Sequence, residues 1–254
     1  MLAPPPHVLA AFDAPEPRPL AGGQGRSWSA GDLVLKPLDL QPDELEWQAD
    51  VLTNINEDGF RVAPPVRALD GSLSVDGWTA WRRVEGAHAE RRWVDAIRAG
   101  ERFHAAIVEF ERPKFLDART DPWSVGDKAA WGELPLERWA HVEPIARLSE
   151  LLRPVDEPSS LMHGDLGGNV LFADGLPPAV IDLSLYWRPP SFASAIVVGD
   201  ALVWEGADAS LAEEVHLQYL TRALIYRAVT QHVARGAVDR EFDTAVEIAR
   251  SLGR

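Results

Sequence analysis

The segment 161–182 combines a polar loop with a short apolar hairpin, and few folds accommodate this combination. Asn169 follows Asp165 by four residues, and the two apolar runs after it, within 169–181, are separated by Gly and Pro. This pattern predicts a β-hairpin. Asp182 ends its second strand. A carboxylate, an amide and a second carboxylate therefore flank one small hairpin.

These three side chains are the groups that phosphoryl transfer from a metal-bound nucleotide requires. One carboxylate orients and deprotonates the attacking hydroxyl, and two oxygen ligands hold the magnesium that bridges the phosphates. Each residue alone is weak evidence, because Asp165 and Asn169 can equally cap a turn and Asp182 can end a buried strand. A metal-dependent hydrolase using Asp165 and Asp182 is a further interpretation. The three residues together, in this order, are more specific evidence for phosphoryl transfer than any one of them.

Composition and charge narrow the class of protein. The chain is 46% hydrophobic and has no cysteine, which predicts a globular protein without disulfides or thiolate sites. Its 39 acidic and 25 basic residues leave a net charge of −14, which repels nucleic acid and attracts a cationic small molecule. The alternative is that the acidity serves only solubility. No signal-peptide pattern or apolar run near ~20 residues occurs, so we expect a cytoplasmic protein without a membrane partner. The oligomeric state stays open.

The predicted secondary structure changes near residue 84. Before it, turns separate short strand-like runs, at 26–30, 33–36, 66–69, 73–75 and 78–81. Gly31-Asp32 and Asp70-Gly71 are predicted hairpin turns, and one helix is predicted over 42–52. After it, the apolar spacing is helical over 91–108, 211–235 and 239–252. We therefore expect two domains, 1–84 and 85–254.

The polar motif resembles the catalytic and metal-binding loops of the aminoglycoside phosphotransferase and choline kinase-like enzymes, a branch of the protein-kinase-like fold. The resemblance is carried by His163-Gly164-Asp165-Leu166, Asn169 and Ile181-Asp182. It implies a two-lobed α/β (α+β) protein, with a small N-terminal antiparallel sheet plus helix and a larger, mainly helical C-terminal lobe that bears the catalytic hairpin. It also implies Mg²⁺-dependent transfer of the γ-phosphate of ATP or GTP to a hydroxyl of a small molecule.

The resemblance implies a role for each residue of the motif. Asp165 would be the catalytic residue that accepts the proton of the substrate hydroxyl. Asn169 would ligate one magnesium ion, and Asp182 would bridge the metal ions to the phosphates. We expect His163 to hold the loop by hydrogen bonds rather than to transfer protons.

The loop departs from the family pattern in its length. Asn169 lies four residues after Asp165, whereas five is usual. We expect Gly167 and Gly168 to make the tighter path by adopting backbone angles that other residues cannot reach. The short loop also keeps an alternative open, a catalytically weak or inactive nucleotide-binding or regulatory protein with the same fold.

Residues of the first lobe match the family's nucleotide site. Gly23 and Gly25 lie where the family has its glycine-rich nucleotide loop, although glycine-rich turns are common between strands. Lys36 ends an apolar strand, where a lysine can reach the α and β phosphates. Only three lysines occur in the chain, which argues against a merely solvated side chain. Glu46 is the first choice for the carboxylate that holds Lys36, and Glu44 is the second. Helical spacing places them on different faces and cannot decide between them.

Further candidate positions lie outside these motifs. The backbone around Val84 would meet an adenine edge at the hinge between the lobes. Asp200 resembles the aspartate that braces the catalytic loop, but a helix-surface carboxylate is equally compatible. Trp187 and Arg188 follow Asp182 closely, where substrate or phosphate could meet them. For Trp187 the alternative is packing on the adjacent prolines.

Overall fold

The computed structural model describes residues 3–20 and 25–253, and it divides into two compact units. The first comprises Met1–Ala87 with Leu171–Asp182, and the second comprises His88–Val170 with Leu183–Arg254. The mixed α/β class predicted from the sequence is confirmed, with a small antiparallel sheet in one unit and mostly helices in the other.

An antiparallel sheet forms the frame of the first unit. Its strands are β1 (Arg18–Pro19), β2 (Trp28–Ala30), β3 (Leu33–Pro37), β5 (Pro65–Val66), β6 (Ser74–Val75) and β7 (Trp78–Arg82). The order is β1-β2-β3-β7-β5, and β6 also pairs with β7. The predicted turn at Gly31-Asp32 joins two paired strands. The turn at Asp70-Gly71 does not, because β6 pairs with β7 across Asp76-Gly77, whose φ values of 47° and 73° suit a tight hairpin.

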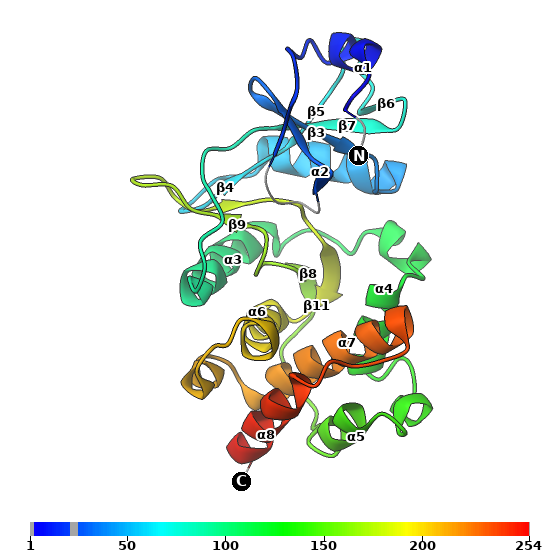
Figure 1. Cartoon of the computed structure of the whole chain (residues 1–254), viewed down its shortest axis with the longest axis vertical. Helices are drawn as coiled ribbons and strands as arrows, with labels where there is room; N and C mark the ends of the chain where they lie inside the picture. Colours follow the sequence, from blue (N-terminus) through cyan, green and yellow to red (C-terminus); the bar gives the residue numbers. More distant parts are fainter. Residues whose placement is uncertain (1–2, 21–24, 254) are drawn as a thin grey trace. The chain divides into compact units, whose positions relative to one another are not determined.

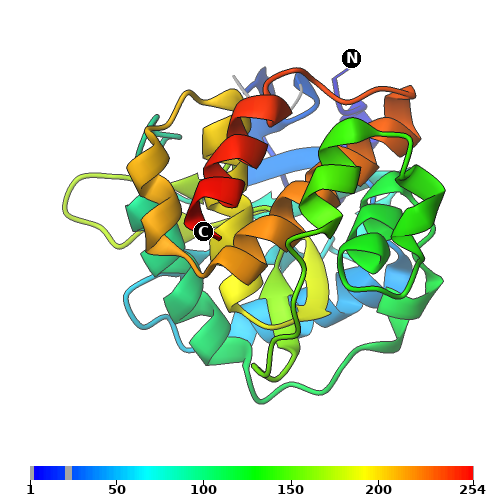
Figure 2. The same ribbon diagram turned by 90° about the horizontal axis from the view of Figure 1, so that it is seen from below.

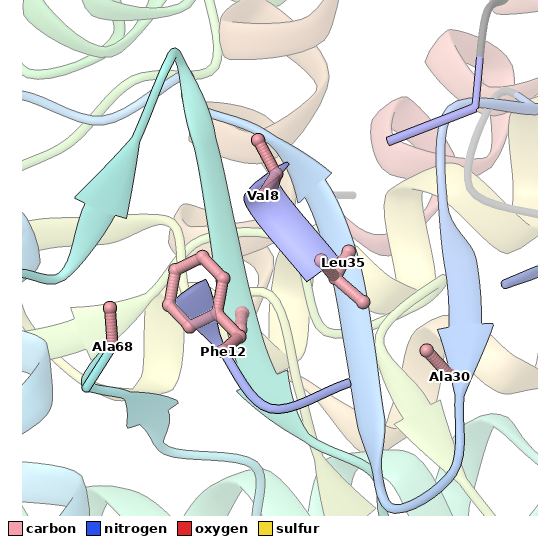
Figure 3. Packing of buried hydrophobic residues seen from close by; sticks show 6 residues of the cluster. Val8, Phe12, Ala30, Leu35 and Ala68 are labelled. Atoms are coloured by element: carbon pink, nitrogen blue, oxygen red, sulfur yellow. The ribbon is translucent and has the colours of Figure 1, made fainter. Parts of the chain in front are cut away.

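One helix packs on each face of this sheet, because alternate residues of a strand point to opposite sides. Leu35 faces α1 (Pro6–Ala11), where Val8 and Phe12 complete a buried cluster (Figure 3). Val34, one residue earlier, packs against the cluster that α2 (Pro42–Asn54) contributes to the other side. Lys36 alternates with Leu35 in the same way and therefore lies on the α2 face.

A second small sheet joins the segment 171–182 to the first unit. Its strands are β4 (Arg61–Val62), β9 (Val170–Leu171) and β10 (Ala179–Val180), in the order β4-β10-β9. The strands β9 and β10 are the arms of the predicted hairpin, and β10 runs parallel to β4. Arg61 Nε donates to the carbonyl of Pro177 at 2.7 Å. These long-range bonds place with the first unit a segment that the sequence division assigned to the second domain.

The second unit is built on helices. They are α3 (Trp93–Ile107), α4 (Pro122–Ala130), α5 (Glu143–Ser149), α6 (Ser191–Trp204), α7 (Leu217–Arg235) and α8 (Phe242–Leu252), with the 3₁₀ turns η2 (Lys114–Ala118), η3 (Leu136–Trp139) and η4 (Ala209–Glu214). Helix α7 packs against α4, α5, α6 and α8 (Figures 1 and 2). The single helix predicted over 211–235 is interrupted, because His216 caps the start of α7 by accepting from the backbone N–H of Gln218 at 3.2 Å.

Two strands of the second unit were not predicted. Strand β8 (Ser160–His163) pairs antiparallel with β11 (Leu185–Arg188), and Leu185 lies opposite His163. This ladder connects the two ends of the polar motif. Within the part of the chain that the structure describes, no helix has both the length and the apolarity to cross a membrane.

Candidate functional site

His163 organises the loop that carries Asp165. The imidazole is buried, and its Nδ1 accepts hydrogen bonds from the backbone N–H groups of Asp165 at 3.3 Å and Ser184 at 3.1 Å. An Nδ1 that accepts two bonds carries no proton. His163 therefore ties the start of the loop to Ser184, the residue before β11, and holds the loop by hydrogen bonds as we expected.

A second histidine, His104 of α3, supports the first, and the sequence analysis missed it. Its Nε2 accepts from the backbone N–H of His163 at 3.0 Å. Burial first, and the neighbouring His163 second, lower the pKa of His104 to about 3, so His104 stays a neutral acceptor at ordinary pH. The sequence contained a signal for a buried His104, because this residue shares the apolar helical face of Ile97 and Ile107.

Gly164 lets the loop approach an aromatic ring. A Cβ at this position would lie 2.6 Å from two ring carbons of Tyr186. That ring cannot easily move, because Tyr186 is buried and its hydroxyl forms a 3.0 Å hydrogen bond with that of Tyr226. Burial also raises the pKa of Tyr186 to about 12, which keeps the phenol protonated. Glycine is thus required here by space.

We expect Gly164→Ala to destabilise the protein by about 1–3 kcal/mol, the usual cost of overpacking a rigid site. Gly168→Ala is the matched control, since a Cβ there would meet nothing within 4 Å. Its effect should stay within about 0.5 kcal/mol. Urea unfolding of both variants measures the difference, and equal stabilities would contradict the close approach.

The glycines at 167 and 168 do not have the role that the sequence suggested. Neither adopts a positive φ, and both positions have room for a Cβ. The prediction of special backbone angles was therefore wrong. The loop closes instead through an ordinary turn, in which the backbone N–H of Asn169 donates to the carbonyl of Leu166 at 3.0 Å.

Asn169 turns its amide toward Asp165. Its Nδ2 donates to the backbone carbonyl of Asp165 at 2.7 Å and to Oδ2 of its carboxylate at 3.2 Å. The amide nitrogen is used in these two bonds, so the carbonyl Oδ1 is the atom of Asn169 suited to a cation. A carbonyl oxygen of this kind fits the ligand preference of Mg²⁺.

Asp165 is held on its other side by Arg227 of α7. The Asp165 side chain is 48% exposed, and its Oδ1 accepts from Arg227 Nη2 at 2.9 Å. Arg227 is only 5% exposed and also binds Asp200, through Nε at 2.8 Å and through Nη2 at 2.5 Å. Asp200 is thus no surface carboxylate. It braces Asp165 indirectly, through a shared arginine.

The charges in this group shift one another's pKa values. Burial raises the pKa of Asp200, and the guanidinium of Arg227 opposes that rise. Burial alone would lower the pKa of Arg227, but the neighbouring carboxylates, Asp200 first, raise it well above its ordinary value. Arg227 therefore stays charged. It was not predicted, although its position seven residues after Leu220 and three after Leu224 places a charge on an apolar helical face.

In the first unit, Lys36 lies beside Asp182. Lys36 Nζ donates to Asp182 Oδ1 and lies 4.3 Å from the ring centroid of Trp81. The Lys36 side chain is 14% exposed, whereas that of Asp182 is 45% exposed. Asp182 has a φ of 49°, a left-handed conformation that Asp tolerates better than most residues. The proposed phosphate lysine and the proposed metal carboxylate are thus neighbours.

The predicted pairing of Lys36 with Glu46 is not what the structure has. Glu46 is exposed and binds Arg67, with Nη2 to Oε2 at 2.6 Å. Glu44 is 3% exposed and sits beside buried Leu45 on the side of α2 that packs against the sheet. Burial thus distinguishes two carboxylates that helical spacing alone could not.

The other predicted positions are placed as follows. Gly25 has a φ of 67°, a conformation natural for glycine, and Gly23 lies outside the described residues. Val84 is half-buried in the segment after β7, and the carbonyl of the following Glu85 accepts from Arg61 at 2.9 Å.

Arg188 is part of the framework of the second unit. It binds Asp127 through Nε at 2.9 Å and Nη2 at 2.7 Å, and Glu133 through Nη2 at 2.6 Å. Its side chain is 15% exposed. These carboxylates occupy the guanidinium, so a role in phosphate binding is not favoured.

The donors available for magnesium are oxygen atoms of different kinds. Among residues 3–20 and 25–253, no three His, Asp or Glu side chains cluster in a way that would hold a metal ion. Asn169 of the second unit offers an amide oxygen and Asp182 of the first unit a carboxylate, and each is a hard oxygen donor of the kind that Mg²⁺ prefers.

A family model and solved structures relate the chain to known proteins. Residues 18–186 match the profile of the phosphotransferase enzyme family. A comparison with curated protein sequences found no match.

Solved structures share the fold. A spectinomycin phosphotransferase, determined with ADP and spectinomycin, is 14% identical with a TM-score of 0.59, and the alignment covers 94% of each chain. An aminoglycoside phosphotransferase from Alicyclobacillus acidocaldarius is 16% identical with a TM-score of 0.58, covering 100% of this chain and 93% of that one. The Plasmodium vivax ethanolamine kinase is 10% identical with a TM-score of 0.55, covering 95% of this chain and 82% of the kinase.

Proposed function

Because the chain belongs to the phosphotransferase enzyme family, we propose that it transfers the γ-phosphate of ATP or GTP to a hydroxyl of a small molecule, with Mg²⁺. One observation carries the proposal. Asp165 presents a half-exposed carboxylate whose two oxygens are each fixed by one donor, Arg227 on Oδ1 and Asn169 on Oδ2. A carboxylate held in this way is suited to orient a hydroxyl.

In this proposal Asp165 binds the acceptor hydroxyl and takes its proton. Each carboxylate oxygen has two acceptor positions, so an oxygen that already accepts one bond can accept a second. The exposed half of the side chain gives the acceptor access. Phosphoryl transfer passes through a loose transition state, so the orientation of the hydroxyl matters more than a strongly basic carboxylate.

The remaining residues would bind the nucleotide. Asn169 Oδ1 and the carboxylate of Asp182 would hold magnesium, which when bound neutralises charge on the phosphates. Lys36 would contribute a positive charge to the phosphates, and the buried Glu44 would replace Glu46 as the carboxylate that orients it. The backbone near Val84 would receive the base, and Gly25 would contribute to the phosphate loop.

The overall charge favours one kind of acceptor. The chain carries 14 net negative charges, which raise the local concentration of cations around it. A small hydroxyl compound bearing positive charge is therefore the acceptor class we propose. The spectinomycin phosphotransferase and the ethanolamine kinase show that this fold serves small-molecule acceptors in other proteins.

Nucleotide binding is the first test. A ligand selective for the folded state at about 100 times its Kd stabilises a protein by about 2.7 kcal/mol. We expect Mg-ATP or Mg-GTP to raise the melting temperature by several degrees, and Lys36→Ala to remove most of this rise. Lys114→Ala, a change of an exposed lysine in η2, is the control and should leave the rise intact. No shift in the parent with millimolar nucleotide would refute the proposal.

A further inference from the structure

Arg227 is buried, and it contacts both aromatic rings and carboxylates. Its guanidinium contacts two aromatic rings, with Cζ 5.1 Å from the centroid of Trp123 and 4.9 Å from that of Tyr226. Its nitrogens contact two different carboxylates, Asp200 and Asp165. One guanidinium thus meets aromatic rings and two acids at once.

The two carboxylates make different contacts with the guanidinium. Nε and Nη2 form a two-point contact with Asp200, which fixes the plane of the guanidinium. Nη2 carries two hydrogens, and its other contact is Asp165 Oδ1. The direction of this second bond follows from the first, so Asp200 determines where Arg227 holds Asp165.

We propose that Arg227 is a positioning residue, which holds Asp165 in the orientation that the acceptor hydroxyl requires, and that Asp200 is its anchor. The inference rests on the proposed function. Asp165 is half exposed, so without a fixed donor its carboxylate would sample several rotamers. The short loop has no positive charge of its own between Asp165 and Asn169, and α7 provides one from another part of the chain.

Arginine is needed for this task and lysine is not equivalent. A planar guanidinium makes a two-point contact with one carboxylate and still directs an N–H at another, whereas an ammonium is a point charge without a preferred plane. Arg227→Lys keeps the charge and loses the direction. A displacement of about 1 Å at the reacting group can cost about 100-fold in rate.

The matched control comes from the same unit. Arg188 contacts Asp127 through Nε and Nη2 and a second carboxylate, Glu133, through Nη2, which repeats the pattern of Arg227. It has no contact to Asp165 among the described hydrogen bonds. Arg188→Lys should therefore resemble Arg227→Lys in stability and differ from it in catalysis.

The experiment measures Mg-ATP hydrolysis with water as the acceptor, together with the KM for ATP and the melting temperature. We expect Arg227→Lys to lower kcat about 10- to 100-fold with an unchanged KM. Asp200→Asn should lower kcat less, and Arg188→Lys should not lower it. A parent-like kcat in Arg227→Lys, or an equal loss in Arg188→Lys, would overturn the positioning role while leaving the phosphotransferase assignment intact.

A crystal structure of each folded variant adds a measurement that needs no turnover. We expect a single Asp165 rotamer in the parent and in Arg188→Lys, and a displaced or divided side chain in Arg227→Lys. If Arg227→Lys does not fold, Asp200→Asn takes its place, because the amide loosens the anchor without removing Arg227. A parent-like Asp165 in the variant examined would refute the inference, whereas an inactive parent that binds no nucleotide would refute the proposed function.

Discussion

Asp165→Asn is expected to lower the rate of phosphoryl transfer by about 10²- to 10⁴-fold, the usual contribution of a positioned acid or base. The asparagine oxygen can still accept from Arg227, so the fold and the loop should persist. Nucleotide affinity should stay near the parent value, because the carboxylate acts mainly in the transition state. Mg-ATP turnover, with water or with a panel of aminoglycosides, choline-like amines and sugars, measures the rate.

The control for this variant is Asp174→Asn. Asp174 is an exposed carboxylate in the turn between β9 and β10, so its neutralisation changes the net charge equally without touching Asp165. Turnover that is equal in the parent and in Asp165→Asn would remove Asp165 as the base. Nucleotide binding without turnover for any acceptor would favour a kinase-like binding protein instead of an enzyme.

Arg227→Met is expected to destabilise the protein by about 3–5 kcal/mol at neutral pH. Asp200 would remain buried without its counter-charge, and an uncompensated buried charge strongly destabilises the folded state. The double variant Arg227→Met/Asp200→Asn removes the stranded charge as well and should recover part of the loss. Chemical unfolding of the parent, both single variants and the double variant gives the coupling free energy. A double variant no more stable than Arg227→Met would contradict this account.

The stability lost in Arg227→Met should also depend on pH. Burial raises the pKa of Asp200 above its ordinary value, and the loss of Arg227 removes the charge that opposes this rise. A carboxyl whose pKa is higher in the folded state binds its proton more tightly there, so its contribution to stability is present at low pH and is lost as pH rises through the folded pKa. The difference in unfolding free energy between the parent and Arg227→Met should therefore shrink from pH 7 to about pH 5.

The sequence carried the local part of the site. Spacing within one segment gave Asp165, Asn169 and Asp182 as candidates, and these stay a prediction. Alternation and turn chemistry predicted most strands of the first unit, with the α2 helix between them. These signals depend on neighbours a few residues apart. Where two turns competed, at Asp70-Gly71 and Asp76-Gly77, the choice depended on which strands could pair, and the local pattern could not settle it.

Such local signals do not reveal contacts between residues that lie far apart in the sequence. The pair of β8 and β11 was not predicted because each strand is short and gains its partner only in the folded chain. Glu46 was preferred over Glu44 as the partner of Lys36. In the structure Glu44 is buried and Glu46 forms an ion pair with Arg67. The glycines of the loop suggested strain, whereas the folded loop closes with a common turn.

What the sequence determined by itself was the set of candidate groups, because a carboxylate, an amide and a second carboxylate at fixed spacing limit the chemistry that a chain can perform. What only the tertiary structure decided was how they are held. Arg227 lies 62 residues from Asp165 along the chain and contacts it because α7 packs in the core of its unit. Packing brings together residues that share no local pattern, and the direction of a hydrogen bond exists only once both partners have been placed.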